Sequence, residues 1–137
     1  MLPLNSSANI DRYEAEPYVF AEYVTSPDHE TENQASHSWL TGTAVWMYRI
    51  ALDHILGFRT SLSGITVAPN IPACWKTFKA ERTFRGKRIM LTVTNPEGAN
   101  STIRSMKVNG NDVQSAFIDV ASIEAQTIVV DIILGTI

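Results

Sequence analysis

The stretch TAVWMYRIALDHIL, from Thr43 to Leu56, decides how the rest of the chain is interpreted. One stripe of it carries apolar residues at helical spacing: Ala44, Tyr48, Ala51 and Ile55. Other apolar residues widen this stripe, and polar side chains interrupt it at Arg49, Asp53 and His54. The spacing predicts a helix, ended by Gly57 in the left-handed conformation. A helix that is apolar on most sides must be enclosed by other elements.

The residues before this helix supply few secondary-structure elements that could cover its apolar surface. The pair Glu16-Pro17 is typical of a helix entry and predicts a short helix over Tyr18 to Val24. Ser26-Pro27-Asp28 ends it, and the polar residues 28–37 predict a loop. Two helices cannot enclose each other, so the helical half, residues 1–57, is expected to be cut out of a larger helical domain.

After Gly57 the hydrophobic period changes from helical to alternating. Strands are predicted over Gly64–Ala68, Phe78–Phe84, Arg88–Thr94, Ile103–Val108, Asp112–Phe117 and Thr127–Leu134. The turn signals between them are Asn95-Pro96-Glu97-Gly98 and Asn109-Gly110. The prediction is an α+β chain whose second half is an antiparallel β-sandwich.

Composition excludes several classes of function. The 137 residues carry a net charge of -3, which gives no electrostatic reason to expect a nucleic-acid partner. The apolar-rich stretch 39–56 is interrupted by charges, so no membrane span is expected. Cys74 is the sole cysteine and no secretion signal is recognisable, which favours a cytoplasmic protein. The three histidines and this cysteine lack metal-ligand spacing, so no metal site is predicted.

An ordered set of motifs carries a family resemblance. These are EPYVFAEYV (16–24), SWLTGTAVW (38–46), ILGFR (55–59), IPACW (71–75), FRGK (84–87) and Asn95-Pro96. In this order and spacing, from about residue 4 to about residue 113, they resemble the C-terminal part of family 94 glycoside phosphorylases, the cellobiose and cellodextrin phosphorylase group.

The resemblance implies a fold and a domain division. Family members have a catalytic (α/α)6 barrel flanked by β-sandwich domains. Residues 1–57 would then be the last helices of the catalytic barrel, and residues 58–137 would be the C-terminal β-sandwich domain. The missing neighbours of the apolar helix would be the other barrel helices.

The resemblance also implies an activity. The family cleaves a β-glucosidic bond of a disaccharide or oligosaccharide with phosphate and gives α-glucose 1-phosphate with inversion. A carboxylic acid protonates the leaving oxygen, and phosphate itself attacks the anomeric carbon. The family's general acid is an aspartate in a region that precedes these residues, so no catalytic residue is assigned to this chain and the fragment is expected to be inactive alone. Inorganic phosphate is the co-substrate, and no cofactor is implied.

Two site assignments follow from the resemblance. Thr41 and Gly42 match the family's phosphate-contacting Thr-Gly pair, just before a predicted helix whose free N–H groups favour an anion. The alternative is that Thr41 or Thr43 caps the helix. Glu22 falls where several members carry a glutamine near the sugar, so it is a candidate substrate-binding residue. The alternative is a solvated glutamate at a helix end.

Other conspicuous side chains are expected to be structural. His37 could touch a sugar, but a structural role is preferred, and Trp46 is expected in the core. Trp39 and Trp75 could stack on sugars. Four basic residues near a turn predict a solvated or interdomain face rather than an anion site: Arg82, Arg85, Lys87 and Arg88.

Two other functions stay open. One is a non-catalytic β-sandwich module that self-associates through exposed helix surface. The other is one half of a split phosphorylase, whose partner chain would supply the missing barrel.

Overall fold

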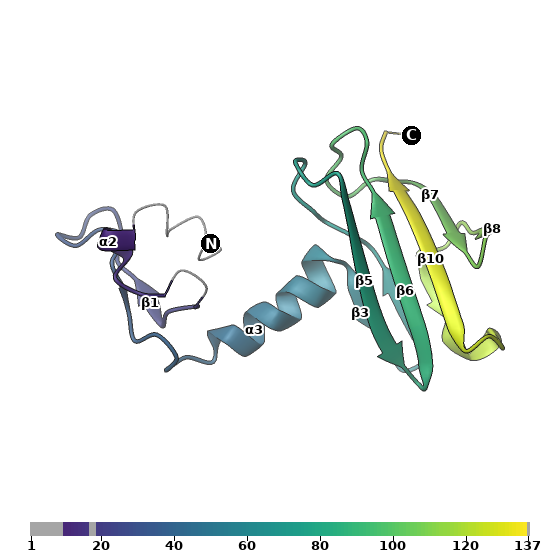
Figure 1. Cartoon of the computed structure of the whole chain (residues 1–137), viewed down its shortest axis with the longest axis horizontal. Helices are drawn as coiled ribbons and strands as arrows, with labels where there is room; N and C mark the ends of the chain where they lie inside the picture. The colour runs from purple at the N-terminus through teal and green to yellow at the C-terminus, as the bar shows by residue number, and fades with distance from the viewer. Residues whose placement is uncertain (1–9, 17–18, 137) are drawn as a thin grey trace. The chain divides into compact units, whose positions relative to one another are not determined.

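A computed structural model describes residues 10–16 and 19–136 of the chain (Figure 1). The chain divides into two compact units, residues 1–49 and residues 50–137. Each unit is described by itself below. No helix in the described residues has both the length and the apolar character needed to cross a bilayer.

The first unit is built on short elements. It contains the helix α2 (Ile10–Tyr13) and an antiparallel ladder of β1 (Tyr23–Val24) with β2 (Ala35–Ser36). Tyr13, Val19 and Ala35 are buried, and the Tyr13 hydroxyl donates to the Val19 carbonyl at 3.4 Å. Among the described residues of this unit, turns, bends and irregular segments connect these short elements.

The helix predicted over Tyr18–Val24 is wrong for the described residues, because Tyr23 and Val24 form a strand. The turn that was expected to end the helix instead closes a hairpin. Thr25 N–H donates to the Gln34 carbonyl, and Gln34 N–H donates to the Thr25 hydroxyl, both at 3.0 Å. These bonds give the backbone a partner outside a helix. Residue 18 lies outside the described residues.

The helix predicted over Thr43–Leu56 is confirmed, with one difference in its last turn. It consists of α3 (Thr43–Ile50) followed by a π-helical turn (Ala51–Ile55), in which Leu56 N–H donates to the Ala51 carbonyl at 2.8 Å. Gly57 follows with φ of +70°, as predicted for a left-handed cap. In the described chain no residue of α3 is buried, and Trp46 is 72% exposed, so the core position expected for Trp46 is not observed.

Two sheets make up the second unit (Figure 1). In the described residues, the large sheet contains, in spatial order, β5 (Thr77–Phe84), β6 (Lys87–Thr94), β10 (Thr127–Leu134), β7 (Ile103–Val108) and β8 (Asn111–Asp112). The small sheet contains β3 (Phe58–Thr60), β4 (Gly64–Val67) and β9 (Phe117–Asp119). A 3-10 turn (Val120–Ser122) follows β9.

The two sheets pack over one apolar core, which makes the unit a β-sandwich. The small sheet contributes Phe58, Ile65, Val67 and Ile118. The large sheet contributes Ile89, Leu91, Val93, Met106, Val108, Ile128, Val130, Ile132 and Leu134. Buried and exposed residues alternate along β6 and β10, the period-two pattern expected of strands with one face on a core. The described chain is therefore mostly β-sheet with few helices, which is compatible with the predicted α+β class.

One pairing departs from the antiparallel prediction. β10 runs parallel to β6, from Thr127 opposite Arg88 to Ile133 opposite Thr94, while β10 is antiparallel to β7. A parallel pair needs a long connection rather than a tight turn. Residues 95–126 supply it, and they include both β7 and β9.

The strand boundaries agree with the sequence where one sheet is involved and differ where the chain changes sheets. Ile103–Val108 and Thr127–Leu134 are strands as predicted, joined to their neighbours by turns such as Asn109-Gly110, with φ of 49° and 83°. The single strand predicted over Asp112–Phe117 is wrong. β8 ends at Asp112, and the chain crosses to the small sheet, where the Ala116 carbonyl accepts from Val67 N–H at 2.9 Å.

Two of the four basic side chains near the β5–β6 turn, Arg82 and Lys87, have structural roles, while Arg85 and Arg88 are exposed as predicted. Arg82 donates to the Phe58 carbonyl at 2.8 Å and lies 3.7 Å from Asp53 of the π turn. Lys87 donates to the carbonyls of Val120 and Ile123. The prediction of a solvated or interdomain patch is therefore wrong for Arg82 and Lys87.

Candidate functional site

Thr41 and Gly42 lie directly before the first turn of α3. Gly42 carbonyl accepts from Trp46 N–H at 3.3 Å, which opens the helical hydrogen-bond pattern. The Thr41 hydroxyl accepts from Thr43 N–H at 3.0 Å and donates to the Thr43 hydroxyl at 2.7 Å. Thr41 thus makes a capping contact with the first residue of α3, of the kind that the alternative interpretation describes. This contact occupies the Thr43 N–H and leaves the next N–H groups of the first turn without a partner inside the helix.

The space around Gly42 is open. A Cβ atom built at this position would meet nothing within 4 Å, and Gly42 is exposed while Thr41 is half-buried. The backbone at Gly42 is accessible to a ligand, and the helix dipole favours an anion there. A ligand can therefore approach the Gly42 backbone without meeting a side chain, and phosphate binding at this position stays a prediction.

Glu22 and His37 are brought together by the β1–β2 ladder. Glu22 N–H donates to the Ser36 carbonyl at 3.2 Å, which places the next residue, His37, opposite Glu22. His37 Nδ1 lies 3.5 Å from Glu22 Oε2, and the two side chains are 53% and 55% exposed. The His37 ring also lies 6.0 Å from the Tyr23 ring, centroid to centroid. Glu22 is thus an exposed carboxylate with an imidazole beside it, on a strand end rather than a helix end.

Glu16 is a residue that sequence reasoning missed. Its Oε1 accepts from Trp39 Nε1 at 3.0 Å, although the two residues are far apart in the chain. Hydrogen bonds from the Glu16 backbone, and then from the side chains of Trp39 and Ser38, hold the pKa of Glu16 below its ordinary value. No local signal could have indicated this contact, because it depends on the hairpin that returns the chain to Glu16.

Two residues between β2 and Thr41 adopt the left-handed backbone conformation. His37 has φ of 51° and Trp39 has φ of 71°. Histidine tolerates this region better than most residues, but a bulky tryptophan rarely adopts it. Such conformations cost on the order of 1–3 kcal/mol each and persist where the surroundings hold them, which is common at functional sites. The hydrogen bond from Trp39 to Glu16 is one such restraint.

Four of the conspicuous side chains of the first unit form two contacting pairs. Glu22 with His37 and Glu16 with Trp39 are contacting pairs, and both flank the segment that leads to Thr41 and Gly42. Trp75 belongs to the other unit, where its ring packs edge-on against Phe78 with centroids 6.4 Å apart. Among the described residues no three His, Cys, Asp or Glu side chains are grouped as a metal site would require.

Comparison with known proteins identifies the family of this chain. Residues 1–57 match the family described as glycosyl hydrolase 94 superfamily, catalytic domain. The chain is 38% identical over 133 residues to an N,N'-diacetylchitobiose phosphorylase of Vibrio furnissii, which covers 97% of this chain and 16% of that protein. It is 34% identical over 112 residues to the protein of the same name from Vibrio proteolyticus, covering 82% of this chain and 14% of that protein.

A third relative, solabiose phosphorylase of Paenibacillus borealis, is 27% identical over 113 residues, covering 82% of this chain and 15% of that protein. The chain therefore spans about a sixth of the length of these relatives. The family match covers the segment that contains Thr41, Gly42 and Glu22, and the match to the first relative continues through the sandwich. We conclude that the chain belongs to the glycosyl hydrolase 94 superfamily and corresponds to a fragment of a family 94 phosphorylase.

Proposed function

We propose that this chain forms part of an inverting sugar phosphorylase, which cleaves β-linked glucose disaccharides or oligosaccharides with inorganic phosphate to give α-glucose 1-phosphate. The observation that carries the proposal is the position of Thr41 and Gly42, at the open start of α3 within the segment that matches the family's catalytic domain. In this reaction inorganic phosphate is a co-substrate, and no metal or organic cofactor takes part.

In the proposed site, Thr41 and Gly42 bind phosphate. The N–H groups of the first turn of α3 donate to phosphate oxygens, and the Thr41 hydroxyl turns from Thr43 to the anion. Glycine at position 42 lets the backbone approach the phosphate closely, because no side chain intervenes. Phosphate held in this way would be oriented to attack the anomeric carbon of the sugar.

Glu22 is proposed to accept hydrogen bonds from sugar hydroxyls. Its side chain is exposed, and the nearby His37 imidazole orients it. A carboxylate accepts but does not donate, so it selects hydroxyl donors. Glu22 is not proposed as the general acid.

The proposed reaction needs groups beyond this chain. We propose that residues 1–57 complete an (α/α)6 barrel whose other helices cover the exposed residues of α3, and that an aspartate of that barrel protonates the leaving oxygen. Without this acid the chain alone is expected to be inactive. The exposure of Val45, Trp46 and Tyr48 supports this part of the proposal, since apolar surface of this extent is characteristic of an interface.

The test compares two proteins in an assay of sugar 1-phosphate release. The 137-residue chain alone is expected to show no phosphorolysis, and a protein that carries it behind an upstream barrel region is expected to be active. The substrates are cellobiose, a cellodextrin and N,N'-diacetylchitobiose, the last because two relatives bear its name. Activity of the 137-residue chain alone would refute the proposal that the general acid lies outside this chain.

The phosphate role is tested in the active protein with Thr41→Val, Thr41→Ser and the control Thr83→Val on the exposed face of β5. Loss of a hydrogen bond to a charged group, worth about 1.5–3 kcal/mol, raises the KM for phosphate about 10- to 100-fold in Thr41→Val. Thr41→Ser keeps the hydroxyl and stays near the parent. If Thr41 only caps α3, Thr41→Val lowers the melting temperature and leaves this KM unchanged.

A second candidate function rests on the sandwich. Its core is contained in residues 50–137, and the exposed apolar side chains of α3 offer a surface for association with another copy or with a separate barrel chain. The split-phosphorylase alternative predicts that activity appears when the chain is mixed with a separately expressed upstream barrel. We also propose a cytoplasmic location, to which the exposed free thiol of Cys74 is suited.

A further inference from the structure

The strand β5 forms one edge of the large sheet (Figure 1). It pairs with β6 without a register shift from Thr77, opposite Thr94, to Phe84, opposite Lys87. Among the described residues it has no ladder partner on its other side, and none of its own residues is fully buried. It contains neither a proline nor a bulge. An exposed edge of this length and regularity is a template for pairing with a further strand.

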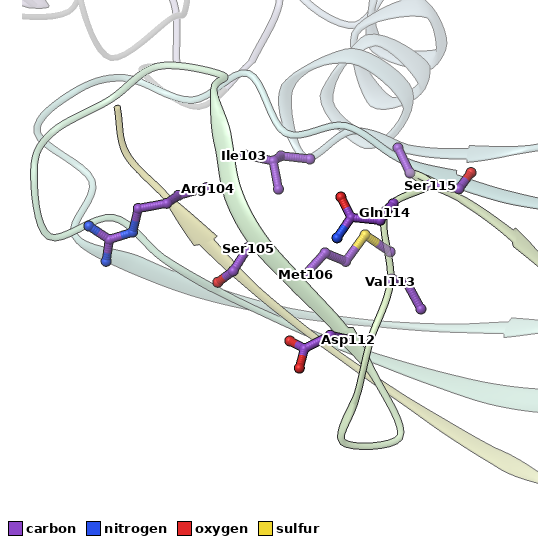
Figure 2. Close-up of a pocket in the computed structure, with 9 residues that line it drawn as sticks. Ile103, Arg104, Ser105, Met106, Asp112, Val113, Gln114 and Ser115 are labelled. Carbon is purple, nitrogen blue, oxygen red and sulfur yellow. The ribbon is translucent and has the colours of Figure 1, made fainter. Parts of the chain in front are cut away.

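The opposite edge of the large sheet lacks these properties. β8 has two residues, and the segment from Asp112 to Ser115 then leaves the sheet, with a hollow of about 330 Å³ between it and β7 (Figure 2). The pairing of β7 with β10 is also irregular, because its register shifts between Ile133 and Leu134. Short edge strands and bulges protect a sheet from further pairing. Of the two edges, β5 is therefore the one that suits an added strand.

The backbone groups that β5 offers follow from its pairing with β6. The Asn95 N–H donates to the Lys76 carbonyl at 2.7 Å, directly beside the first ladder pair. Bonds in an antiparallel ladder alternate along each strand, so the even-numbered residues from Lys76 to Phe84 bond to β6. The N–H and C=O groups of the odd-numbered residues point away from β6, toward the open edge. These residues are Thr77, Lys79, Glu81 and Thr83.

The side chains of the same four residues share the exposed face of the sheet. Two of them, Lys79 and Glu81, carry opposite charges. Glu81 contacts Arg88 of β6 through both carboxylate oxygens, each at 2.6 Å, and remains about half exposed. Lys79 is exposed and has no hydrogen-bond or ion-pair partner among the described residues. The edge therefore offers a free ammonium group next to a carboxylate that still has acceptor capacity.

We propose that β5 pairs with β5 of a second copy of this chain, antiparallel about a two-fold axis beside Ala80, so that the large sheet continues from one copy into the other. In this register Lys79 of each copy lies opposite Glu81 of the other. Thr77 of each copy likewise lies opposite Thr83 of the other. Cross-strand pairs of opposite charge, and of threonine with threonine, favour pairing. One patch thus serves both copies, as a two-fold interface requires.

The same charges select the register and the occupant. A slide of the two strands by two residues places Glu81 opposite Glu81, or Lys79 opposite Lys79, and like charges directly opposite each other are destabilising. An unrelated extended peptide is the rival occupant, since it could use the same backbone groups. The alternation of Lys79 and Glu81 is complementary to itself, so a second copy matches it without any further sequence requirement. The contact lies in the sandwich unit and does not depend on the phosphorylase proposal.

The association is expected to be weak and reversible, with a Kd on the order of 10–100 μM, because a single polar edge buries little surface. Analytical ultracentrifugation of the 137-residue chain over a series of concentrations measures it. Lys79→Glu places glutamates opposite each other, and Glu81→Lys places lysines opposite each other. Each variant alone is expected to raise the Kd about tenfold or more. An equimolar mixture of the two variants restores both Lys–Glu pairs and is expected to associate about as tightly as the parent.

Arg59→Glu and Glu124→Lys make the same charge changes at exposed positions outside β5 and are expected to leave the Kd unchanged. Glu81→Lys also removes the contact with Arg88, so Lys79→Glu alone carries the test if Glu81→Lys lowers the melting temperature. A parent chain that stays monomeric over the whole series would overturn the proposal. A Kd that Lys79→Glu leaves unchanged, as expected if the copies meet through α3, would also overturn it.

Amide hydrogen exchange locates the contact within the strand. The Lys79 and Glu81 amides are expected to exchange more slowly at concentrations where the dimer predominates. The Ala80 and Arg82 amides bond to β6 at every concentration and are the internal controls. Exchange at Lys79 and Glu81 that does not depend on concentration would overturn the proposal, and so would protection that appears only when an unrelated extended peptide is added.

Discussion

His37 Nδ1 lies 3.5 Å from Glu22 Oε2 at the end of the β1–β2 ladder. The pair joins two residues that the sequence singles out separately, and it places the Glu22 carboxylate on a strand end. Because both side chains are more than half exposed, solvent screens their attraction, and the contact orients Glu22 more than it stabilises the unit.

Glu22→Ala is therefore expected to weaken sugar binding without changing stability much. The free energy of unfolding should change by less than about 1 kcal/mol, because exposed ion pairs contribute little. In an active phosphorylase that carries this chain, the KM for the sugar should rise, because alanine cannot accept a hydrogen bond from a sugar hydroxyl, while the KM for phosphate stays the same. Glu30→Ala, on an exposed turn, is the matched control. A sugar KM unchanged by Glu22→Ala would remove Glu22 from the substrate site.

Gly57→Ala is expected to destabilise the sandwich by about 3 kcal/mol or more. The left-handed conformation at φ of +70° costs a non-glycine residue about 1–2 kcal/mol, and the added Cβ overlaps the Ala68 carbonyl. Gly86→Ala isolates the first contribution, because Gly86 has φ of +77° and nothing within 4 Å of its Cβ. Chemical denaturation of both variants measures the difference. If Gly57→Ala and Gly86→Ala lost the same free energy of unfolding, the Ala68 backbone would be moving aside for the new methyl group at position 57.

Asn95→Asp is expected to unfold or strongly destabilise the sandwich. Asn95 is fully buried, and its Nδ2 donates to the carbonyls of Trp75 at 3.0 Å and Ala99 at 2.8 Å. A carboxylate cannot donate, so the substitution buries a charge against two carbonyl oxygens and should cost about 3 kcal/mol or more. Asn100→Asp adds the same charge at an exposed position and should cost little. Similar melting temperatures for the two variants would contradict this role of Asn95.

Glu97 is expected to make stability fall in acid. Hydrogen bonds from the Thr136 backbone and hydroxyl, with the nearby Arg104 charge, hold the pKa of Glu97 below its ordinary value in the folded chain. A lowered folded pKa means that the ionised form favours folding. This contribution is fully present above the unfolded pKa, which is about 4.3, and is lost as pH falls through the folded pKa.

Melting temperatures of the parent and Glu97→Gln, measured from about pH 6 to about pH 3, test this expectation. The parent should lose more stability than the variant over this range. Glu16 and Glu81, whose pKa values are also lowered, contribute equally to both proteins. Glu124→Gln, which removes an exposed carboxylate elsewhere, should follow the parent. Parallel curves for the parent and Glu97→Gln would show that the bonds to Thr136 do not contribute to folding.

The sandwich strands were largely predictable, because local alternation reports which face of a strand is buried. Ile103–Val108 and Thr127–Leu134 carry this pattern over their full length and are strands with the predicted bounds. The prediction over Asp112–Phe117 failed because alternation does not report that a chain changes sheets. The alternation also could not predict the parallel pairing of β10 with β6, because that pairing depends on the path of residues 95–126.

The candidate site was predictable only in part. The position of Thr41 and Gly42 before a helix followed from the apolar period of residues 43–56, and the structure confirms that helix. The binding roles of Thr41, Gly42 and Glu22 stay predictions. The Glu16–Trp39 and Glu22–His37 contacts were not predictable, because each joins residues separated by a hairpin.

The sequence by itself determined the helix that starts at Thr43, most strand positions and the left-handed cap at Gly57, because these depend on hydrophobic period and backbone freedom within a few residues. Its ordered motifs also determined the family resemblance. Tertiary structure alone decided the parallel pair of β6 and β10 and the partners of Glu16 and Glu22. It also decided the hydrogen bonds of Arg82 and Asn95. Those depend on which distant segments meet: core burial sets the strand pairing and the place of Asn95, and the hairpin of the first unit sets the exposed contacts of Glu16 and Glu22.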